Sequence, residues 1–167
     1  IRIVNRLDRN TSGILILAKN EYIQECLIKQ MKTNEFKKEY LAIAKGFLES
    51  KSGTLNFPIA RKEGSIIERT VSSDGDSAIT HYDVVKEFNN LSLVHIVLET
   101  GRTHQIRVHF SHIGHPILGD TLYGSPSELI NRQALHSYKL TFIHPVTKKK
   151  LILESSLPND IKNIINN

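Results

Sequence analysis

The segment that decides the fold is Ala78–Glu99, with the sequence AITHYDVVKEFNNLSLVHIVLE. Its two halves, Ala78–Phe88 and Leu91–Glu99, are rich in the β-branched and aromatic residues that favour strands. Asn89 and Asn90 separate the halves, and such a pair suits the tight turn between two antiparallel strands. We therefore predict a β-hairpin in the middle of the chain.

Strand-like segments also lie on both sides of this hairpin. Lys37–Phe47 precedes it, and Ala134–Ile143 and Lys150–Glu154 follow as a closing pair. Near the start of the chain, Arg2–Leu7 predicts one strand and Ile14–Ala18 predicts another. Because Ile14–Ala18 is apolar throughout, we expect both of its faces to be covered.

Three helices complete the predicted elements. Asn20 is a suitable N-cap for the helix Glu21–Thr33, and Thr103 for a second helix that ends near His112. The third covers Pro158–Ile165, with proline at its start. Since the strands follow one another through hairpins instead of alternating with helices, we predict the α+β class with a largely antiparallel sheet.

Residues 51–77 differ in character from the rest of the chain. Glycines, a proline, serines and charged residues surround two short strand-like pieces, Thr54–Ile59 and Ile66–Val71. We interpret this part as a mobile two-stranded excursion, not as a separate domain. The whole chain, residues 1–167, is then one domain.

The composition restricts the classes of protein to consider. Lys and Arg number 22 against 17 Asp and Glu, and the net charge of +5 favours a polyanionic partner such as nucleic acid. A basic surface kept for solubility explains that charge equally well. No apolar run reaches the roughly 18–20 residues that span a bilayer, so we expect no membrane partner. The single cysteine, Cys26, excludes an intrachain disulfide and fits a cytoplasmic protein. The chain begins with Ile1, which we interpret as a trimmed N-terminus.

A polar segment near the N-terminus places a carboxylate where core packing does not need one. Asp8 follows the first predicted strand and lies between Arg6 and Arg9, in a turn that ends at Gly13. Side chains presented just past a strand end are often functional. The alternative is an aspartate that only stabilises the turn.

Two further segments carry groups that suit RNA. Lys37 and Lys38 precede Tyr40 on one predicted strand, where they would attract phosphates beside a ring that stacks on a base. The alternative is a core tyrosine with solvated lysines. Residues 100–109 hold two arginines, two histidines and a glutamine, which are groups that bind phosphates, riboses and bases. The alternative is the polar, solvated start of a helix.

Together these segments resemble the RNA pseudouridine synthases of the RluA type, which modify uridines in ribosomal or transfer RNA. The signature around the family's catalytic aspartate, His-Arg-Leu-Asp-x-x-Thr-Ser-Gly-Leu, is matched by Asn5–Ile14 with Asn5 in place of histidine. Four further signatures of the family follow in the same order. They are matched by Lys38–Tyr40, Gly101–His109, Gly114–Asp120 and Leu135–Ser137.

The resemblance covers the chain from Arg2 to about Pro158. It implies the pseudouridine synthase fold, a mixed and mostly antiparallel curved sheet flanked by a few helices, with the catalytic cleft across the sheet. The family normally has a strand with a Lys-Pro-x-Gly segment before this point, and often an RNA-binding S4 domain. We expect both to be absent from this chain.

The resemblance also assigns roles to site residues. It implies that Asp8 is the catalytic carboxylate, that Arg107 pairs with it, and that Tyr40 stacks on the target base and could serve in the later proton transfer at C5. Leu135 corresponds to the apolar residue that packs against the uracil. Whether the carboxylate attacks C1′ or removes the 2′ proton stays open, and no cofactor or metal is implied.

The expected partner is RNA, with ribosomal RNA preferred over transfer RNA, and the expected state is a monomer. Cationic and polar side chains would hold the RNA and so offset the cost of flipping a uridine out of its stack. We predict this role for Arg6, Arg9, Lys37, Lys38, Arg102, His104 and Gln105.

Three rival interpretations follow from the residues alone. The histidines between His104 and His115 could ligate zinc, but no HExxH pattern or cysteine pair accompanies them. A non-catalytic RNA-binding module explains the basic charge, but not an acid between two arginines. A glycoside hydrolase would need a second carboxylate, for which Glu99 and Asp120 are the candidates.

Overall fold

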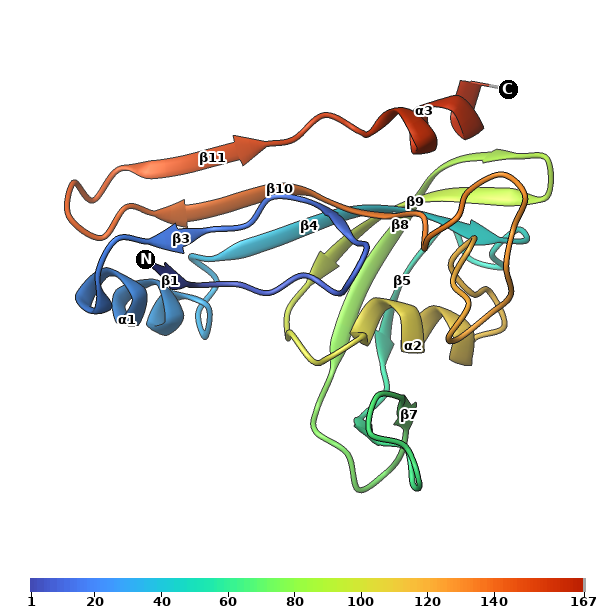
Figure 1. Ribbon diagram of the computed structural model, residues 1–167, viewed down its shortest axis with the longest axis horizontal. Helices are drawn as coiled ribbons and strands as arrows, with labels where there is room; N and C mark the ends of the chain where they lie inside the picture. Colours follow the sequence, from blue (N-terminus) through green and yellow to red (C-terminus); the bar gives the residue numbers. More distant parts are fainter. Residues whose placement is uncertain (167) are drawn as a thin grey trace.

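A seven-stranded sheet organises the residues that this computed structural model describes, 1–166. Six strands lie in the order β11-β10-β4-β9-β8-β5, with every neighbouring pair antiparallel (Figure 1). They are β4 (Lys37–Lys45), β5 (Ser52–Asn56), β8 (Ile79–Phe88), β9 (Leu91–Leu98), β10 (Leu135–Ile143) and β11 (Lys150–Glu154). The short β2 (Ser12–Gly13) adds to β10 in parallel. The prediction of an α+β fold with a largely antiparallel sheet is confirmed.

The central hairpin forms where the sequence predicted it. Phe88 and Leu91 are the last paired residues of β8 and β9, so Asn89 and Asn90 form the two-residue turn. Both asparagines have positive φ angles, 48° and 59°. A hairpin turn of this length that matches the twist of the strands requires positive φ at both positions, and asparagine tolerates it.

The N-terminal segment is less regular than expected. Only β1 (Arg2–Ile3) and β3 (Leu17–Ala18) pair there, as a separate two-stranded ribbon. The prediction that Ile14–Ala18 is a strand covered on both faces is wrong, because Leu15 and Leu17 are 45% and 49% exposed. The alternate residues Ile14 and Ile16 face the core, so only one side of this apolar run is buried.

Residues 51–77 divide between two sheets. The predicted piece Thr54–Ile59 is split, since β5 joins the main sheet beside β8. The pairing within the excursion is instead between β6 (Ile59–Arg61) and β7 (Arg69–Val71), which form a two-stranded hairpin. This hairpin projects from the sheet below α2 in Figure 1.

The three predicted helices are present with shifted ends. α1 (Glu21–Gln30) begins after Asn20, whose side chain accepts a hydrogen bond from Ile23 N at 3.0 Å. α2 (Gln105–His112) starts one residue later than predicted. Thr103 is not its cap, because His104 precedes the helix in a left-handed conformation, φ 58°, and forms no side-chain capping bond.

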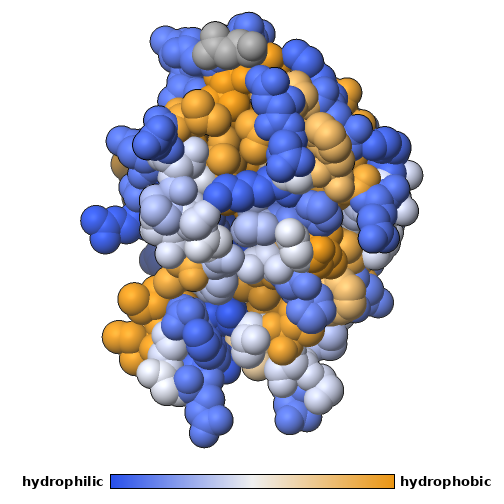
Figure 2. All heavy atoms as spheres, turned by 90° about the vertical axis from the view of Figure 1, so that its right-hand side faces the viewer, coloured by the Kyte–Doolittle hydropathy of each residue, from blue (hydrophilic) through white to orange (hydrophobic). Residues whose placement is uncertain are grey.

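The last helix, α3 (Asn159–Asn166), covers the sheet on the side opposite α1 and α2 (Figure 1). Ile161 and Ile164 are buried in the main hydrophobic core, which also includes Phe110 of α2 and Ile43 of β4. Figure 2 views the end where the chain terminates, and hydrophobic side chains gather there near α3. α1 packs on a second, smaller cluster around the far part of the sheet.

Candidate active site

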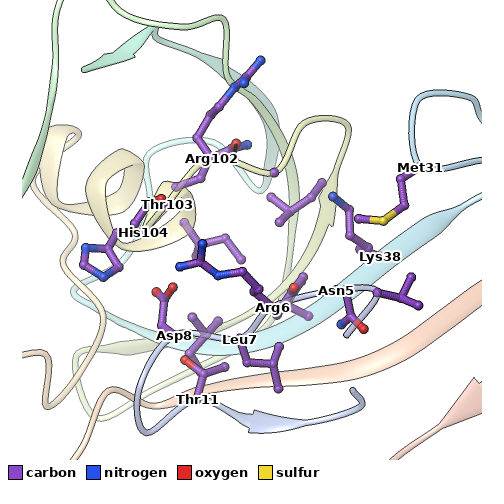
Figure 3. Close-up of a pocket in the computed structure, with 17 residues that line it drawn as sticks. Asn5, Arg6, Leu7, Asp8, Thr11, Met31, Lys38, Arg102, Thr103 and His104 are labelled. Carbon is purple, nitrogen blue, oxygen red and sulfur yellow. Dashed lines mark hydrogen bonds between the residues drawn. The ribbon is translucent and has the colours of Figure 1, made fainter. Parts of the chain in front are cut away.

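A cavity of about 250 Å³ opens over β4, between the end of α1 and the start of α2 (Figure 3). Residues 4–8 and 101–106 form two of its walls. The remaining lining residues are Thr11, Met31, Lys38, Tyr40, Leu98 and Leu135. The three segments that the sequence singled out therefore meet in one place.

The cavity holds the pairing that the resemblance implied. Nη1 of Arg107 lies 3.4 Å from Oδ2 of Asp8, although 99 residues separate the two in the chain. The side chain of Asp8 is 23% exposed and that of Arg107 only 8%. Asp8 thus presents its carboxylate to the cavity, while Arg107 supports it from the protein side.

A second carboxylate, which the sequence analysis named only as a possible second acid of a glycoside hydrolase, holds Arg107. Nε and Nη2 of Arg107 donate to Oδ2 and Oδ1 of Asp120, at 2.7 and 2.9 Å. Burial alone would raise the pKa of Asp120, but the hydrogen bonds and charge of Arg107 outweigh it and the pKa is lowered. Asp120 Oδ1 also accepts the backbone N–H groups of Leu122 and Tyr123. Its place at the end of Gly114–Asp120, which matches a family signature, was the signal in the sequence for this residue.

The other candidate acid lies elsewhere. Glu99 is more than half exposed and pairs with His81 at 2.9 Å, and it does not line the cavity. Asp120 shares Arg107 with Asp8, but its oxygens are already occupied by Arg107 and backbone N–H groups. The two-carboxylate arrangement of a glycoside hydrolase therefore has no support in this geometry.

Tyr40 and Leu135 form an apolar part of the cavity. Both are buried, at 7% and 3% exposure, and they come from the adjacent strands β4 and β10. Burial is the main cause that raises the pKa of Tyr40 to about 12, and the charge of Asp8 adds to it. At neutral pH Tyr40 is therefore an uncharged phenol with a flat ring.

The two predicted lysines lie on opposite faces of β4, because successive side chains of a strand alternate. Lys38 is on the face of Tyr40 and lines the cavity, whereas Lys37 is on the other face and pairs with Glu39 at 3.2 Å. Burial lowers the pKa of Lys38. Within residues 1–166, no ion pair is formed by Lys38.

Two of the three arginines predicted to bind RNA line the cavity, and the third does not. Arg6 and Arg102 line the cavity, and Figure 3 shows Arg6 between Asp8 and Lys38. Arg9 is exposed and lies outside the lining. The cavity thus joins an acidic end at Asp8 to a cationic region.

The side chain of Gln105 forms its hydrogen bonds with other groups of the protein. Its Oε1 accepts from Arg102 N and Thr100 Oγ1, while its Nε2 donates to Ile79 O and Thr80 Oγ1, all within 3.0 Å. The expectation that Gln105 contacts RNA has no support from this placement, since the amide fixes residues 100–105 against β8.

The loop that carries Asp8 is fixed by residues on both sides of it. The buried Asn5 accepts from Ile16 N at 2.7 Å and donates to Ile14 O at 3.3 Å, so this departure from the family signature closes the loop. Gly13, with φ 118°, packs so tightly on β10 that a Cβ atom would lie 2.1 Å from Ser137 O. These contacts set the position of the carboxylate.

The crowded histidines do not form a metal site in the described residues, where no group of three His, Cys, Asp or Glu side chains has a suitable arrangement. His109 is buried, and its ring nitrogens bond to Thr80 Oγ1 at 3.0 Å and Phe57 O at 2.9 Å. Both nitrogens are thus engaged within the protein. No helix within residues 1–166 has the length and apolar character needed to cross a membrane.

Comparisons with known proteins place this geometry in a family. Residues 1–112 match the family described as RNA pseudouridylate synthase. The chain is 46% identical over 165 residues to the Bacillus subtilis protein called uncharacterized RNA pseudouridine synthase YjbO, covering 99% of this chain and 58% of that protein. It is 42% identical over 168 residues to ribosomal large subunit pseudouridine synthase D of Nitrosomonas europaea, covering 95% of this chain and 48% of that protein.

The fold agrees with these matches. A structure of human RNA pseudouridylate synthase domain containing 1 superposes with a TM-score of 0.80 at 27% identity, covering 93% of this chain and 68% of that one. The chain spans about half the length of the curated relatives it matches. The expected pseudouridine synthase fold is confirmed, and the chain belongs to the RNA pseudouridylate synthase family.

Proposed function

We propose that this chain converts specific uridines in RNA to pseudouridine, with Asp8 as the catalytic carboxylate. The observation that carries the proposal is the contact of Asp8 with Arg107 in a cavity that Tyr40 and Leu135 also line. A lone turn-stabilising aspartate needs no buried arginine behind it. Family membership supports the reaction class, and the geometry supports the residue.

The reaction needs a carboxylate but no added group. The N1–C1′ bond of uridine breaks, the uracil turns, and a C5–C1′ bond forms. The proton on C5 leaves to water and N1 takes up a proton from water, so the product is an isomer of the substrate. Asp8 either attacks C1′ or removes the 2′ proton, and both routes require its free oxygen to point into the cavity. Arg107 holds the other oxygen, Oδ2, and so fixes the direction of the carboxylate.

Tyr40 and Leu135 form the surface on which the uracil stacks. An uncharged phenol ring and an apolar side chain, both buried, offer a stacking surface for a base that has left its own stack. Flipping a nucleotide out of a helix costs a few kcal/mol, about what such stacking and backbone contacts return. The pKa of Tyr40, about 12, makes the phenol a donor at neutral pH and not a base.

Large-subunit ribosomal RNA is the target we favour, with transfer RNA as the alternative. The relatives called ribosomal large subunit pseudouridine synthase D are up to 42% identical to this chain. The cations that line the cavity, Arg6, Lys38 and Arg102, suit the phosphates that flank a flipped uridine. The net charge of +5 acts in the same direction.

The decisive experiment measures tritium released to water from ribosomal RNA transcripts labelled at uridine C5. Isomerisation must release this tritium, so the parent protein should release it and Asp8→Asn should not. The variant keeps the size of the side chain, and its RNA affinity should stay within about threefold. A protein that binds the transcript and releases no tritium would be a non-catalytic RNA-binding module. Release by Asp8→Asn at the parent rate would remove Asp8 from the mechanism.

A further inference from the structure

Tyr123, in the loop that follows Asp120, contacts two residues of the site and the β6–β7 hairpin together. Its Oη lies 2.7 Å from Nδ1 of His104, and it accepts the backbone N–H of Arg69 at 2.8 Å. The guanidinium carbon of Arg107 lies 5.1 Å from the centre of its ring, a cation–π distance. Nothing in the family signatures quoted above includes this tyrosine.

The hydrogen bonds of Tyr123 favour one tautomer of His104. The Arg69 amide can only donate, so it uses a lone pair of Oη. The phenol proton then has Nδ1 of His104 as its acceptor at 2.7 Å. In this arrangement Nδ1 carries no proton and Nε2 does. Burial, the largest cause, lowers the pKa of His104, which keeps the ring neutral.

His104 is placed to use that Nε2 proton on a ligand. It lines the cavity, and Figure 3 shows its ring beside Asp8. Its left-handed backbone, φ 58°, turns it out of the helix that follows. Within the described residues, only Nδ1 of this ring forms a hydrogen bond to the protein.

We propose that Tyr123 is a positioning residue that holds His104 as a neutral donor, and that Nε2–H of His104 hydrogen-bonds the nucleotide next to Asp8. This rests on the proposed function. When the N1–C1′ bond breaks, its electron pair stays on the uracil, and the negative charge spreads to the carbonyl oxygens O2 and O4. A fixed N–H donor stabilises that charge without giving up its proton.

The Tyr123 ring also packs against the guanidinium of Arg107. Tyr123 therefore aligns both His104 and Arg107 beside Asp8. Asp120 anchors the loop, because its Oδ1 accepts Tyr123 N at 3.2 Å. Ser111 Oγ donates to Tyr123 O at 2.7 Å and ties the loop to α2. Tyr123 therefore has one defined position relative to His104 and Arg107.

The first test reads the tautomer directly and does not depend on activity. Nitrogen-15 spectra of the histidine rings should show His104 with Nε2 protonated and Nδ1 unprotonated, and His104→Gln identifies the signals by their loss. Tyr123→Phe should abolish this preference. A parent protein with Nδ1 protonated, or an unchanged tautomer in Tyr123→Phe, would overturn the assignment.

The second test separates positioning from folding. Tyr123→Phe should lower kcat for tritium release about tenfold, the worth of one hydrogen bond, with KM for RNA within about threefold. Tyr22→Phe, at an exposed tyrosine, is the matched control and should leave kcat unchanged. Unchanged kcat in Tyr123→Phe, while the parent is active, would refute the role of Tyr123. An inactive parent would instead refute the proposed function.

The donor itself is tested by two substitutions of His104. Glutamine places an amide N–H near the position of Nε2, whereas asparagine reaches only the position of Nδ1. His104→Gln should therefore retain several-fold more turnover than His104→Asn, although asparagine suits the left-handed backbone better. Equal losses in the two variants would show that Nε2–H does not contact the nucleotide.

Discussion

Arg107 is bound more closely to Asp120 than to Asp8. Two hydrogen bonds of 2.7 and 2.9 Å join it to the buried Asp120, whereas one contact of 3.4 Å joins it to the partly exposed Asp8. Such bidentate pairs fix the plane of a guanidinium. Asp120 therefore holds the arginine in place, and the arginine in turn orients the carboxylate that faces the cavity.

Asp120→Asn should impair catalysis from outside the cavity. The amide of asparagine supplies only one oxygen, so one hydrogen bond from Arg107 is lost. In its place an N–H group of Arg107 faces the NH2 group of the amide. We expect a loss of about 1–3 kcal/mol in the free energy of unfolding, and a decrease of at least about tenfold in turnover with RNA affinity within about threefold. Urea unfolding and tritium release measure the two effects.

The control is Glu154→Gln, the same change at an exposed carboxylate that pairs with Lys139 on the far edge of the sheet. Exposed pairs contribute little, so this variant should resemble the parent in both measurements. If Asp120→Asn kept the parent turnover, Arg107 would not need its partner.

The sequence predicted the site better than it predicted the parts around it. Asp8 and Arg107 came from the resemblance, and the structure brings them together. The role of Asp120 could not be found, because a loop aspartate gives no periodic signal and its partner is set by tertiary packing. The opposite faces of Lys37 and Lys38 could have been expected, since alternation along a strand separates neighbours.

Local errors in the predicted elements have a similar cause. The apolar run Ile14–Ala18 was interpreted as a covered strand, but tertiary packing buries only alternate residues of an irregular segment. Thr103 has the chemistry of a helix cap, yet the side chain of Gln105 accepts the backbone N–H of Arg102, and α2 starts one residue later than predicted, at Gln105. The Asn89–Asn90 turn was predictable because its constraint is local.

Gly13→Ala should displace the Asp8 loop. A Cβ atom at this position would lie 2.1 Å from Ser137 O, and the φ angle of 118° is unfavourable for alanine. Gly64→Ala is the matched control, because Gly64 has φ 74° but nothing within 4 Å of the added atom. The control should cost about 1 kcal/mol of stability, and Gly13→Ala at least about 2 kcal/mol more. Equal urea midpoints in the two variants would show that the loop can move away from β10 freely.

Tyr40 should make stability depend on alkaline pH. Its pKa is raised from 10.0 to about 12, mainly by burial, so between these values the unfolded chain has lost a proton that the folded protein keeps. The unfolded state then binds fewer protons, and stability, fully present below pH 10, falls as pH rises toward 12. By about pH 11 the parent should have lost about 1.4 kcal/mol relative to Tyr40→Phe, measured by urea unfolding. Parallel pH curves for the two proteins would contradict the burial of this phenol.

Lys38 and Lys37 provide a paired test of which cations hold RNA. The two are neighbours in the chain, but only Lys38 faces the cavity, while Lys37 pairs with Glu39 behind the sheet. Lys38→Met should weaken RNA binding and reduce the slope of log affinity against log salt by about 0.7–0.9, the value for one phosphate contact. Lys37→Met should change that slope much less.

Lys38→Met should raise the stability of the protein while it lowers the affinity for RNA. Burial lowers the pKa of Lys38, which means that folding disfavours its charge, so Lys38→Met should raise the free energy of unfolding at neutral pH. Lys37 is about half exposed and its substitution should have little effect. A variant that is more stable yet binds RNA less tightly would indicate that the buried ammonium is retained for the substrate. If Lys38→Met instead kept both the affinity and the salt slope of the parent, the phosphates would have to be held by other cations, with Arg6 and Arg102 the next to test.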